Sequence, residues 1–335
     1  MKGSRRFTVF TMLAAGLLAT AAHPTVASAA EIRMRLGWNP PNAEHPYAVA
    51  GNAFKKLVED GSKGEIKVQT FCCFKMGSEE EMVKKLQAGT LDGVIVAQNN
   101  IGPFFPLIDL FVLPYVFRDH DHAVKVLAGP VGREMSEKAA AKAGFHLYSS
   151  ASIAFRNIYN TRRPIESIKD VAGLRYRVPP NPIAIATYKA FGAEPTPLPW
   201  GETLTATQTG IVDGGDLEPT GFLLNGFAEV AKNMAWTEHF TLIAPLMISD
   251  RFLQKLTPEQ RQLVEKAALD ATKAGQDAEL ALDKTIKGKL ETMGVAFTYP
   301  DKAPFVAASA EVRAEFVKER GPEAAKLLEE IETTR

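Results

Sequence analysis

The sequence predicts a mixed α/β protein with two domains. Strand-like runs such as Ile66–Phe71 and Ile153–Asn160 are separated by segments in which apolar residues recur at helical spacing. One helical pattern continues from Pro258 to Met293 behind a strong start signal, Thr257-Pro258-Glu259-Gln260. Of the 335 residues, the 305 that follow residue 30 are enough for two domains of ordinary size.

Residues 1–30 have the pattern of a secretory signal peptide. Lys2, Arg5 and Arg6 precede an apolar run over residues 7–22, and Ala27-Ser28-Ala29 supplies a cleavage site of small residues. The arginine pair hints at a twin-arginine signal, but the residues after it fit that pattern poorly, so we expect Sec export. An uncleaved anchor is the alternative, although the run is short of the ~20 residues that a membrane span needs.

The charge balance excludes electrostatic binding of nucleic acid. The chain has 39 basic and 39 acidic residues, and three of the basic ones lie in the signal peptide. The exported chain therefore carries 36 basic and 39 acidic residues, a net charge of −3. No later stretch is apolar for long enough to cross a membrane, so we expect a soluble protein.

Two adjacent cysteines, Cys72 and Cys73, are the only ones in the chain. An exported protein meets oxidising conditions, so a vicinal disulfide is one interpretation. The interpretation that we favour is that the two cysteines are not bonded to each other and lie on a strand, with one side chain packed inward and the other facing outward. Two thiolates alone make a poor zinc site.

The segment from 173 to 219 carries the strongest functional signal. It opens with a strand over residues 174–178, on which Arg175 and Arg177 share one face, and Pro179 and Pro180 end that strand. A guanidinium at a strand end is a good carboxylate clamp because its planar fork matches two oxygens. An ordinary surface ion pair is the alternative.

The same segment then alternates helices and turns. A helix over residues 183–191 ends at Gly192, and Trp200 and Glu202 open a second helix that ends at Gly210. We expect a sharp turn at residues 213–215, which delivers Asp216 and Glu218.

This order of features resembles the substrate-binding proteins of tripartite ATP-independent periplasmic (TRAP) transporters, the DctP family. The resemblance rests on the series RVP, helix, FGA-PTP-P, aromatic, Glu, helix, G-VDG and an acidic residue. Residues 39–92, which end in AGTLD, residues 113–117 (LPYVF) and residues 229–239 match further parts of the family pattern, so nearly the whole exported chain is covered.

The resemblance implies a two-lobed periplasmic binding protein fold, with a ligand cleft between the lobes and a long lobe-spanning helix. Residues 31–153 and 241–282 would form lobe I, and residues 154–240 and 283–335 would form lobe II.

The resemblance also implies the site. Arg177 would bind a carboxylate with both nitrogens, and Arg156 would make a second contact. The other expected ligand contacts are Asn39 and Gln98 from lobe I, Trp200 as a wall, and Asp216 as an acceptor of hydroxyl or amino protons. For Gln98 a plain turn is the alternative.

The implied function is that of an extracytoplasmic solute receptor for a TRAP transporter. The ligand would be a small organic carboxylate: a dicarboxylate, a sugar acid or a keto acid. The partners would be the TRAP membrane subunits, the location the periplasm and the state a monomer, with no cofactor and no metal. The alternatives are a ligand sensor that presents its closed form to a signalling receptor, and a periplasmic enzyme on a small acid.

Three departures from the family pattern bear on specificity: Pro180 after RVP, Asp216-Leu217 where Glu-Asn or Glu-Trp is common, and Cys72-Cys73 in place of a proline-containing turn. The Asp216-Leu217 pair matters most, because that position helps to select the ligand.

We expect the histidines and the acidic runs to have structural roles before functional ones. Asp119-His120-Asp121-His122 suggests a metal site, but adjacent residues at a helix start point in different directions, so we expect helix capping. His45, before Pro46, is expected to be a loop hydrogen-bonding residue first and a ligand contact second. Glu79 to Glu81 fit the first turn of a helix capped by Ser78. Phosphate-loop, nucleophile-elbow and zinc-protease motifs are absent from the sequence.

Overall fold

Two β-sheets organise residues 31–335, the part of the chain that the computed structural model describes. The predicted signal peptide, residues 1–30, lies outside that part. We call the half built on the five-stranded sheet the first lobe. Its strands, in spatial order, are β2 (Ile66–Phe71), β1 (Ile32–Gly37), β3 (Gly93–Ile95), β10 (Leu246–Ser249) and β4 (Phe145–Tyr148).

The second lobe is built on the six-stranded sheet. Its strands, in spatial order, are β11 (Ala296–Thr298), β9 (Asn233–Ile243), β5 (Ile153–Asn160), β8 (Gly214–Leu217), β6 (Arg175–Val178) and β7 (Glu194–Pro197). β9 leads directly into β10, and β4 leads into β5, so the chain crosses between the lobes at residues 244–245 and 149–152. The exact lobe boundaries stay a prediction.

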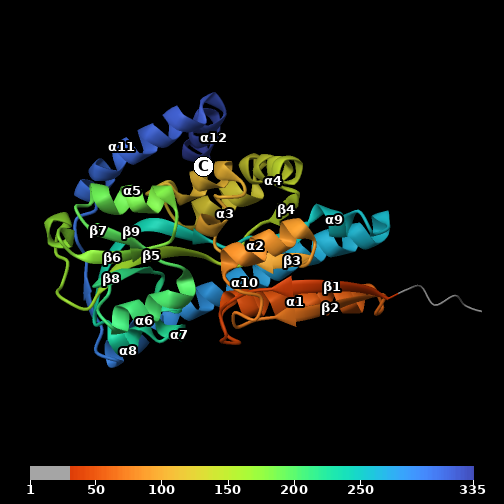
Figure 1. Ribbon diagram of the computed structural model, residues 1–335, viewed down its shortest axis with the longest axis horizontal. Helices are drawn as coiled ribbons and strands as arrows, with labels where there is room; N and C mark the ends of the chain where they lie inside the picture. Colours follow the sequence, from red (N-terminus) through yellow and green to blue (C-terminus); the bar gives the residue numbers. More distant parts are fainter. Residues whose placement is uncertain (1–30) are drawn as a thin grey trace, which may run out of the picture. The chain divides into compact units, whose positions relative to one another are not determined.

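Helices cover both faces of each sheet. In Figure 1, α5 lies on one side of the six-stranded sheet and α6, α7 and α8 lie on the other. The α-helices are α1 (Pro46–Gly61), α2 (Glu79–Ala88), α3 (His120–Ala128), α4 (Pro130–Ala143), α5 (Pro182–Ala190), α6 (Thr203–Gln208), α7 (Pro219–Leu224), α8 (Phe227–Val230), α9 (Asp250–Leu253), α10 (Pro258–Thr292), α11 (Ala303–Arg320) and α12 (Pro322–Thr333). The 3₁₀ segments are η1 (Gln98–Asn100), η2 (Pro106–Val112), η3 (Ile168–Val171) and η4 (Trp200–Glu202).

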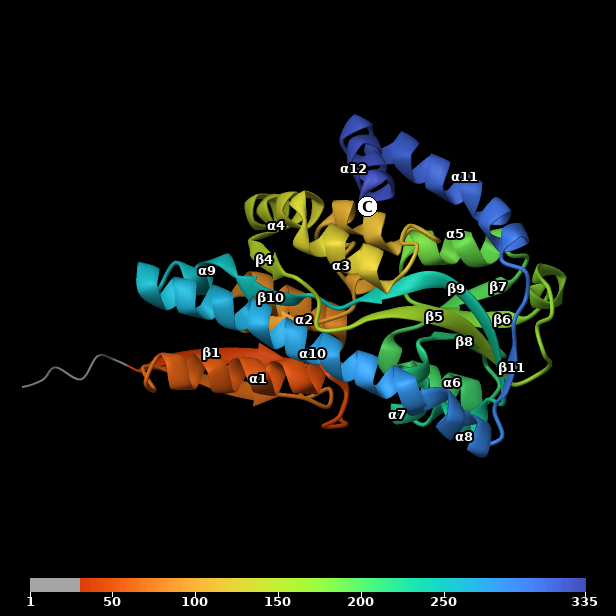
Figure 2. The same cartoon turned by 180° about the vertical axis from the view of Figure 1, so that it is seen from behind.

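The long helix α10 joins the two lobes, as the sequence predicts. It has 35 residues and starts at the predicted capping box, in which Thr257 accepts from Gln260 N and Gln260 bonds back to Thr257 N. Figure 2 shows it passing along α1 and reaching α7 and α8. Gly275 permits a close approach to the chain crossing, since a methyl group there would lie 2.3 Å from Ala151 O.

Apolar side chains fill both faces of the first sheet. Met34 and Leu36 of β1 pack with α1 and with Ala267, Ala268 and Ala271 of α10. The other face is covered by α2, α3, α4 and η2. Because small residues line α10 there, the helix can approach the sheet closely, as its alanine content indicates.

The predicted turn at residues 213–215 is wrong, because Gly214 and Gly215 lie inside strand β8. A side chain at Gly214 would meet Tyr159 O at 2.0 Å, and one at Gly215 would meet the Tyr159 hydroxyl at 2.8 Å. The glycines therefore permit a close approach of β5 and β8 instead of a change of direction.

The favoured interpretation of the cysteines is also wrong, because Cys72 and Cys73 form a vicinal disulfide. It lies in a turn after β2 in which Cys73 and Phe74 both have positive φ, of 64° and 60°. Positive φ is uncommon for residues other than glycine, and the sequence offers no glycine at these positions.

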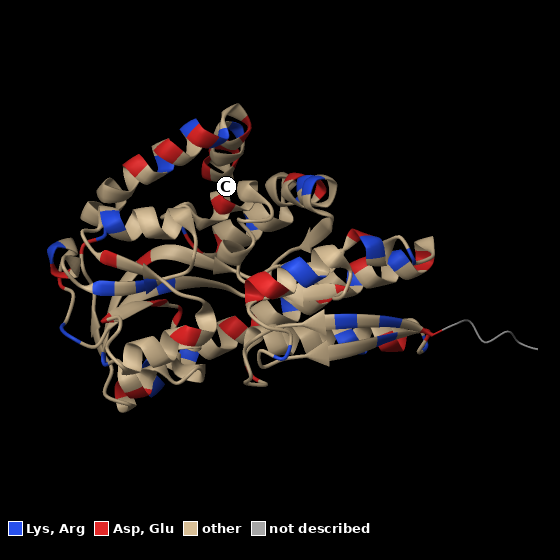
Figure 3. Ribbon diagram, in the orientation of Figure 1, with Lys and Arg blue, Asp and Glu red and all other residues tan. Residues whose placement is uncertain are grey.

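The two remaining structural interpretations of the helix starts are confirmed. Asp119 caps α3 by accepting from His122 N, and Ser78 with Glu81 forms the predicted capping box of α2. Figure 3 shows acidic and basic residues alternating along α10 and α11. On α10 several of these form pairs one turn apart, such as Lys266 with Asp270. Within residues 31–335, none of the helices is both long enough and apolar enough to span a bilayer.

Candidate ligand-binding site

Arg177 lies near the end of β6 and is only 4% exposed. Arg175 shares its face of the strand but is 40% exposed in its side chain and pairs with Asp213 at 3.0 Å. By contrast, Arg177 Nε donates to Leu198 O at 2.9 Å, and no acidic side chain of residues 31–335 forms an ion pair with it. Burial, together with the nearby Arg156 cation, lowers the pKa of Arg177 to about 10. The protein thus holds a buried guanidinium that lacks an anion.

Arg156, on β5, is by contrast fully paired. Its Nε donates to Asp216 Oδ2 and its Nη2 to Asp216 O, both at 2.5 Å, while Nη1 lies 3.5 Å from Glu218 Oε2. Burial acts to raise the pKa of Asp216, yet the Arg156 cation holds it below its usual value. The β5–β9 register shifts between Arg156 and Ile158, so the arginine lies at a bulge, where a side chain can be re-aimed.

Trp200 forms a wall of the site. It opens η4 and stacks on Phe227, with ring centroids 5.5 Å apart and planes 23° from parallel. Arg177 Cζ lies 5.9 Å from the centroid of a Trp200 ring. The indole is thus fixed between the aromatic core of the second lobe and the unpaired cation.

The first lobe contributes polar groups opposite the arginines. Glu79, at the first position of α2, accepts from Ala97 N at 3.0 Å and from Asn100 Nδ2 at 2.5 Å. Burial raises the pKa of Glu79, which favours the neutral acid. His45 caps α1 by accepting from Tyr47 N, and burial lowers the pKa of His45 to about 3, so the imidazole is neutral.

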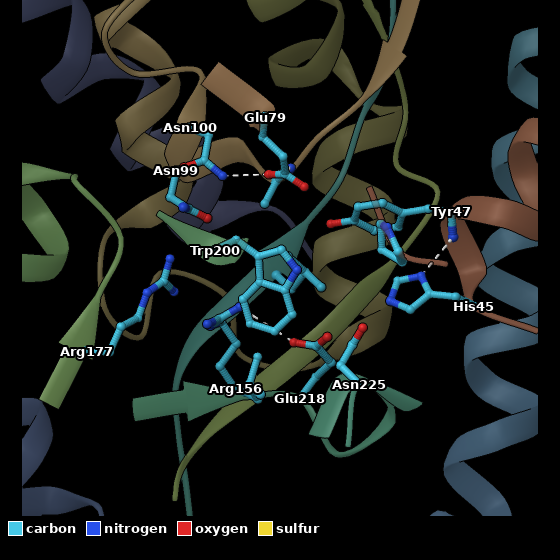
Figure 4. A pocket seen from close by; sticks show the side chains of 14 residues that line it. His45, Tyr47, Glu79, Asn99, Asn100, Arg156, Arg177, Trp200, Glu218 and Asn225 are labelled. Carbon is cyan, nitrogen blue, oxygen red and sulfur yellow. Dashed lines mark hydrogen bonds and ion pairs between the residues drawn. The ribbon is translucent and has the colours of Figure 1, made fainter. Parts of the chain in front are cut away.

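These groups surround one cavity between the lobes. It contains about 480 Å³ of empty space, its open mouth included, which suits one small molecule. Figure 4 shows Arg177, Arg156, Glu218 and Asn225 of the second lobe facing Glu79, Asn99 and Asn100 of the first. The full lining is Pro40, His45, Tyr47, Glu79, Ala97, Asn99, Asn100, Arg156, Arg177, Trp200, Leu217, Glu218, Asn225 and Leu242.

The structure brings three of the six predicted site residues together at this cavity: Arg177, Arg156 and Trp200. Asp216 lies behind Arg156, which it pairs, and does not line the cavity. Gln98 holds β9, because its Nε2 donates to Thr241 O at 2.6 Å and its Oε1 accepts from Ile243 N at 2.9 Å.

Asn39 lies in a smaller neighbouring cavity that Trp200, Glu79 and Asn100 also line. It is 1% exposed, and neither polar atom of its amide has a partner among residues 31–335. Its predicted contact with a ligand stays a prediction.

Sequence reasoning missed Glu79, Asn225 and most of the first-lobe lining. Glu218 carries a usable signal, because it comes directly after a strand and before a helix, a position where ligands bind in α/β proteins. Glu79 carries none, since its run of three glutamates fits a helix N-terminus equally well. Within residues 31–335 no cluster of three or more His, Cys, Asp or Glu side chains has an arrangement that could hold a metal ion.

Comparison with known proteins places these features in context. Residues 39–320 match the DctP family model, described as "Bacterial extracellular solute-binding protein, family 7". A solute-binding protein of Verminephrobacter eiseniae is 33% identical over 314 residues, which cover 92% of this chain and 91% of that protein.

Two solved structures share the fold. A TRAP periplasmic solute binding protein from Pseudomonas putida F1, with bound D-glucuronate, has a TM-score of 0.85 and 30% identity, covering 91% of this chain and 98% of its own. A TRAP periplasmic solute binding protein from Polaromonas sp. JS666, bound to D-erythronate, has a TM-score of 0.85 and 30% identity. The match covers 91% of this chain and 99% of that protein's chain. The predicted two-lobed α/β fold is therefore confirmed.

Proposed function

We propose that this chain, which belongs to the DctP family of bacterial extracellular solute-binding proteins, binds a small sugar acid in the cavity between its lobes. The family consists of solute receptors that work with TRAP membrane components. We place the protein in the periplasm, as a monomer without a cofactor, where it would deliver its ligand to those subunits.

The unpaired Arg177 is the observation that carries the proposal. A buried charge without a partner is costly, so the arrangement makes sense if a ligand supplies the missing anion. Because Nε is already bonded to Leu198 O, the two Nη atoms are left for a carboxylate. The bound structures from Pseudomonas putida F1 and Polaromonas sp. JS666 both hold such acids, D-glucuronate and D-erythronate.

The remaining polar groups favour a hydroxylated acid over a plain dicarboxylate or keto acid. Glu218 Oε2 has no hydrogen-bond partner among residues 31–335, and burial raises the pKa of this carboxyl group. Asn225 Nδ2 donates to Gly221 O at 2.8 Å, which leaves its amide oxygen to accept. Together with Glu79, these groups offer several hydrogen-bonding partners for the hydroxyls of such a ligand.

The same geometry favours binding over turnover. His45, the histidine that lines the cavity, is committed to capping α1, and its lowered pKa makes it a poor base. Arg156, Asp216 and Glu218 neutralise one another. We therefore propose a receptor that closes over its ligand and releases it unchanged.

Calorimetric titration tests the proposal directly. D-glucuronate, D-erythronate, succinate and pyruvate are compared with neutral D-glucose, and we expect saturable binding of at least one sugar acid and none of glucose. Arg177→Ala should weaken binding by roughly 2–5 kcal/mol, as for one partner of a buried charge pair. Arg175→Ala is the matched control, because it removes a guanidinium from the same strand face outside the cavity. Glucose binding, or equal losses in the two variants, would reject the assignment.

A further inference from the structure

The turn after β2 joins two features that the proposed function leaves unused: the Cys72–Cys73 disulfide and the exposed ring of Phe74. The turn is fixed by backbone bonds from Cys73 N to Asn39 O at 3.1 Å and from Gly77 N to Phe74 O at 2.9 Å. Lys85 Nζ also donates to Met76 O at 2.7 Å. A 41% exposed aromatic ring is thus held on a well-ordered support.

Phe74 reaches across the cleft. A methyl group built on Gly201 of the second lobe would lie 3.2 Å from Phe74 Cε1, so the ring occupies the space beside Gly201 that a side chain there would need. Gly201 follows Trp200, the wall of the ligand cavity. Phe74, Trp200 and Gly201 also line the small cavity that contains Asn39. The first lobe therefore touches the cavity wall of the second lobe through this ring.

The disulfide lies directly before the ring in the chain. Cys73 and Phe74 adopt consecutive left-handed conformations, which cost L-residues roughly 1–2 kcal/mol each. The bond between the adjacent sulfur atoms adds a covalent restraint to a turn whose hydrogen bonds also involve Cys73 and Phe74.

We propose that Phe74 is a positioning residue that holds Trp200 over the bound acid when the lobes close, and that the Cys72–Cys73 disulfide makes this contact redox-sensitive. The proposal rests on the proposed function, since it concerns retention of that ligand. Opening the cleft separates Phe74 from Gly201, so the contact stabilises the closed form and slows ligand release.

Reduction should loosen the contact. A dithiol such as dithiothreitol supplies two electrons and two protons, so the S–S bond breaks to two thiols while the reagent closes to its own cyclic disulfide. Cys73 is exposed, so the reagent can reach the bond. The turn then keeps only its hydrogen bonds, which hold Phe74 less firmly, and dissociation of the acid becomes faster.

Stopped-flow kinetics test the proposal, with whichever of D-glucuronate, D-erythronate, succinate or pyruvate binds the wild-type protein. Phe74→Ala should raise the dissociation rate constant on the order of tenfold and leave the association rate constant nearly unchanged. Phe74→Tyr should retain the wild-type rate. Leu269→Ala, which removes a 52% exposed side chain from α10, is the control. Equal dissociation rates in wild type and Phe74→Ala would overturn the proposal.

A double-mutant cycle and the redox state give independent checks. Gly201→Ala should change the dissociation rate, because its methyl group would lie 3.2 Å from Phe74 Cε1 and the ring must shift, but should have little effect when combined with Phe74→Ala. Dithiothreitol should speed dissociation from the wild type but not from Phe74→Ala or from the Cys72→Ser/Cys73→Ser variant. Additive effects in the cycle, or a full response to dithiothreitol in Phe74→Ala, would reject the contact.

Failure of the proposed function is distinguishable from failure of this inference. If no acid binds the wild type, the proposed function fails. The double-mutant cycle of Phe74 and Gly201 is then measured through the melting temperatures of the unliganded variants. Non-additivity there supports the contact between Phe74 and Gly201, whereas additivity rejects it. If an acid binds but Phe74→Ala releases it at the wild-type rate, only the positioning role fails.

Discussion

Arg177 and Trp200 form a unit: Arg177 Cζ lies 5.9 Å from the indole centroid, and Arg177 Nε donates to Leu198 O, two residues before the tryptophan. The guanidinium and the aromatic wall therefore position each other. The ring covers one side of the cation while the Nη atoms are left for an anion. Trp200 should accordingly contribute to affinity through both contact area and cation–π attraction.

Trp200→Leu should weaken binding of the acid by about 1–2 kcal/mol, because the leucine offers no π face to Arg177. Trp200→Phe should lose less. Titration calorimetry measures the change, and Trp236→Leu is the control, because that indole packs against Phe297 outside the cavity. Equal affinities of Trp200→Leu and wild type would contradict the role of the wall.

The Arg156–Asp216 pair should be important for stability. Asp216→Asn keeps the bond from Arg156 to the backbone oxygen of residue 216 but leaves Glu218, at 3.5 Å, as the remaining carboxylate near the buried guanidinium, so urea unfolding should show a loss of about 3 kcal/mol. Asp270→Asn is the control, since its pair with Lys266 is exposed and should change stability by no more than ~0.5 kcal/mol. Similar small changes in both variants would argue against a buried charge at Arg156.

Glu279, buried on α10, should make stability depend on pH. Burial raises its pKa from 4.5 to about 8, and the neighbouring Glu218 adds to the shift. Because the folded-state pKa is above the unfolded value, the folded protein binds more protons between these pH values. The free energy of unfolding should therefore fall as pH rises through this window, with a slope of at most ~1.4 kcal/mol per pH unit.

Glu279→Gln should flatten that slope and be more stable than wild type at pH 9, as measured by urea unfolding at several pH values. Ser152 Oγ, which donates to Glu279 Oε2 at 2.7 Å, can still donate to the amide oxygen. Glu291→Gln, at an exposed position of the same helix, should keep the wild-type profile. An unchanged slope in Glu279→Gln would show that this carboxyl group titrates normally.

Gly275 should be intolerant of any side chain. A methyl group there would lie 2.3 Å from Ala151 O and 3.0 Å from Pro46 O, so Gly275→Ala should push α10 away from both segments and cost about 1–3 kcal/mol or more. Gly288→Ala is the matched control on the same helix, where nothing lies within 4 Å of the new methyl group. It should stabilise the protein by about 0.5–1 kcal/mol through helix propensity. Thermal unfolding of both variants decides the matter.

Local signals predicted much of the fold. The bounds of β2 and β5 were predicted correctly, and both capping boxes lie where their side-chain pattern indicates. β7 was missed because Pro195 and Pro197 suggest a loop; it is an edge strand, where a missing backbone donor is tolerated. The glycines of β8 were misinterpreted because their use depends on Tyr159, a residue far away in the chain.

Local sequence patterns likewise indicate some residues of the candidate site and not others. Strand alternation and a stopping proline indicate Arg177 from a few neighbouring residues. Glu79 becomes a lining residue only because the start of α2 packs against Ala97 and Asn100, which no local pattern reveals. Gln98 was predicted to contact the ligand. In the structure its side-chain amide is hydrogen-bonded to Thr241 O and Ile243 N of β9. Polar residues after a strand can serve either purpose, and tertiary contacts decide between them.

The order of the strands in the first sheet limits how the chain can be divided into fragments or circularly permuted. β10 inserts between β3 and β4, although in the chain it follows five of the six strands of the other sheet, all but β11. A fragment that stops at residue 153 would expose the edges of β3 and β4, which invites aggregation. Reporter insertions for a biosensor should therefore avoid cutting the chain into lobes, and coexpression of the two sequence halves is more promising than producing either alone.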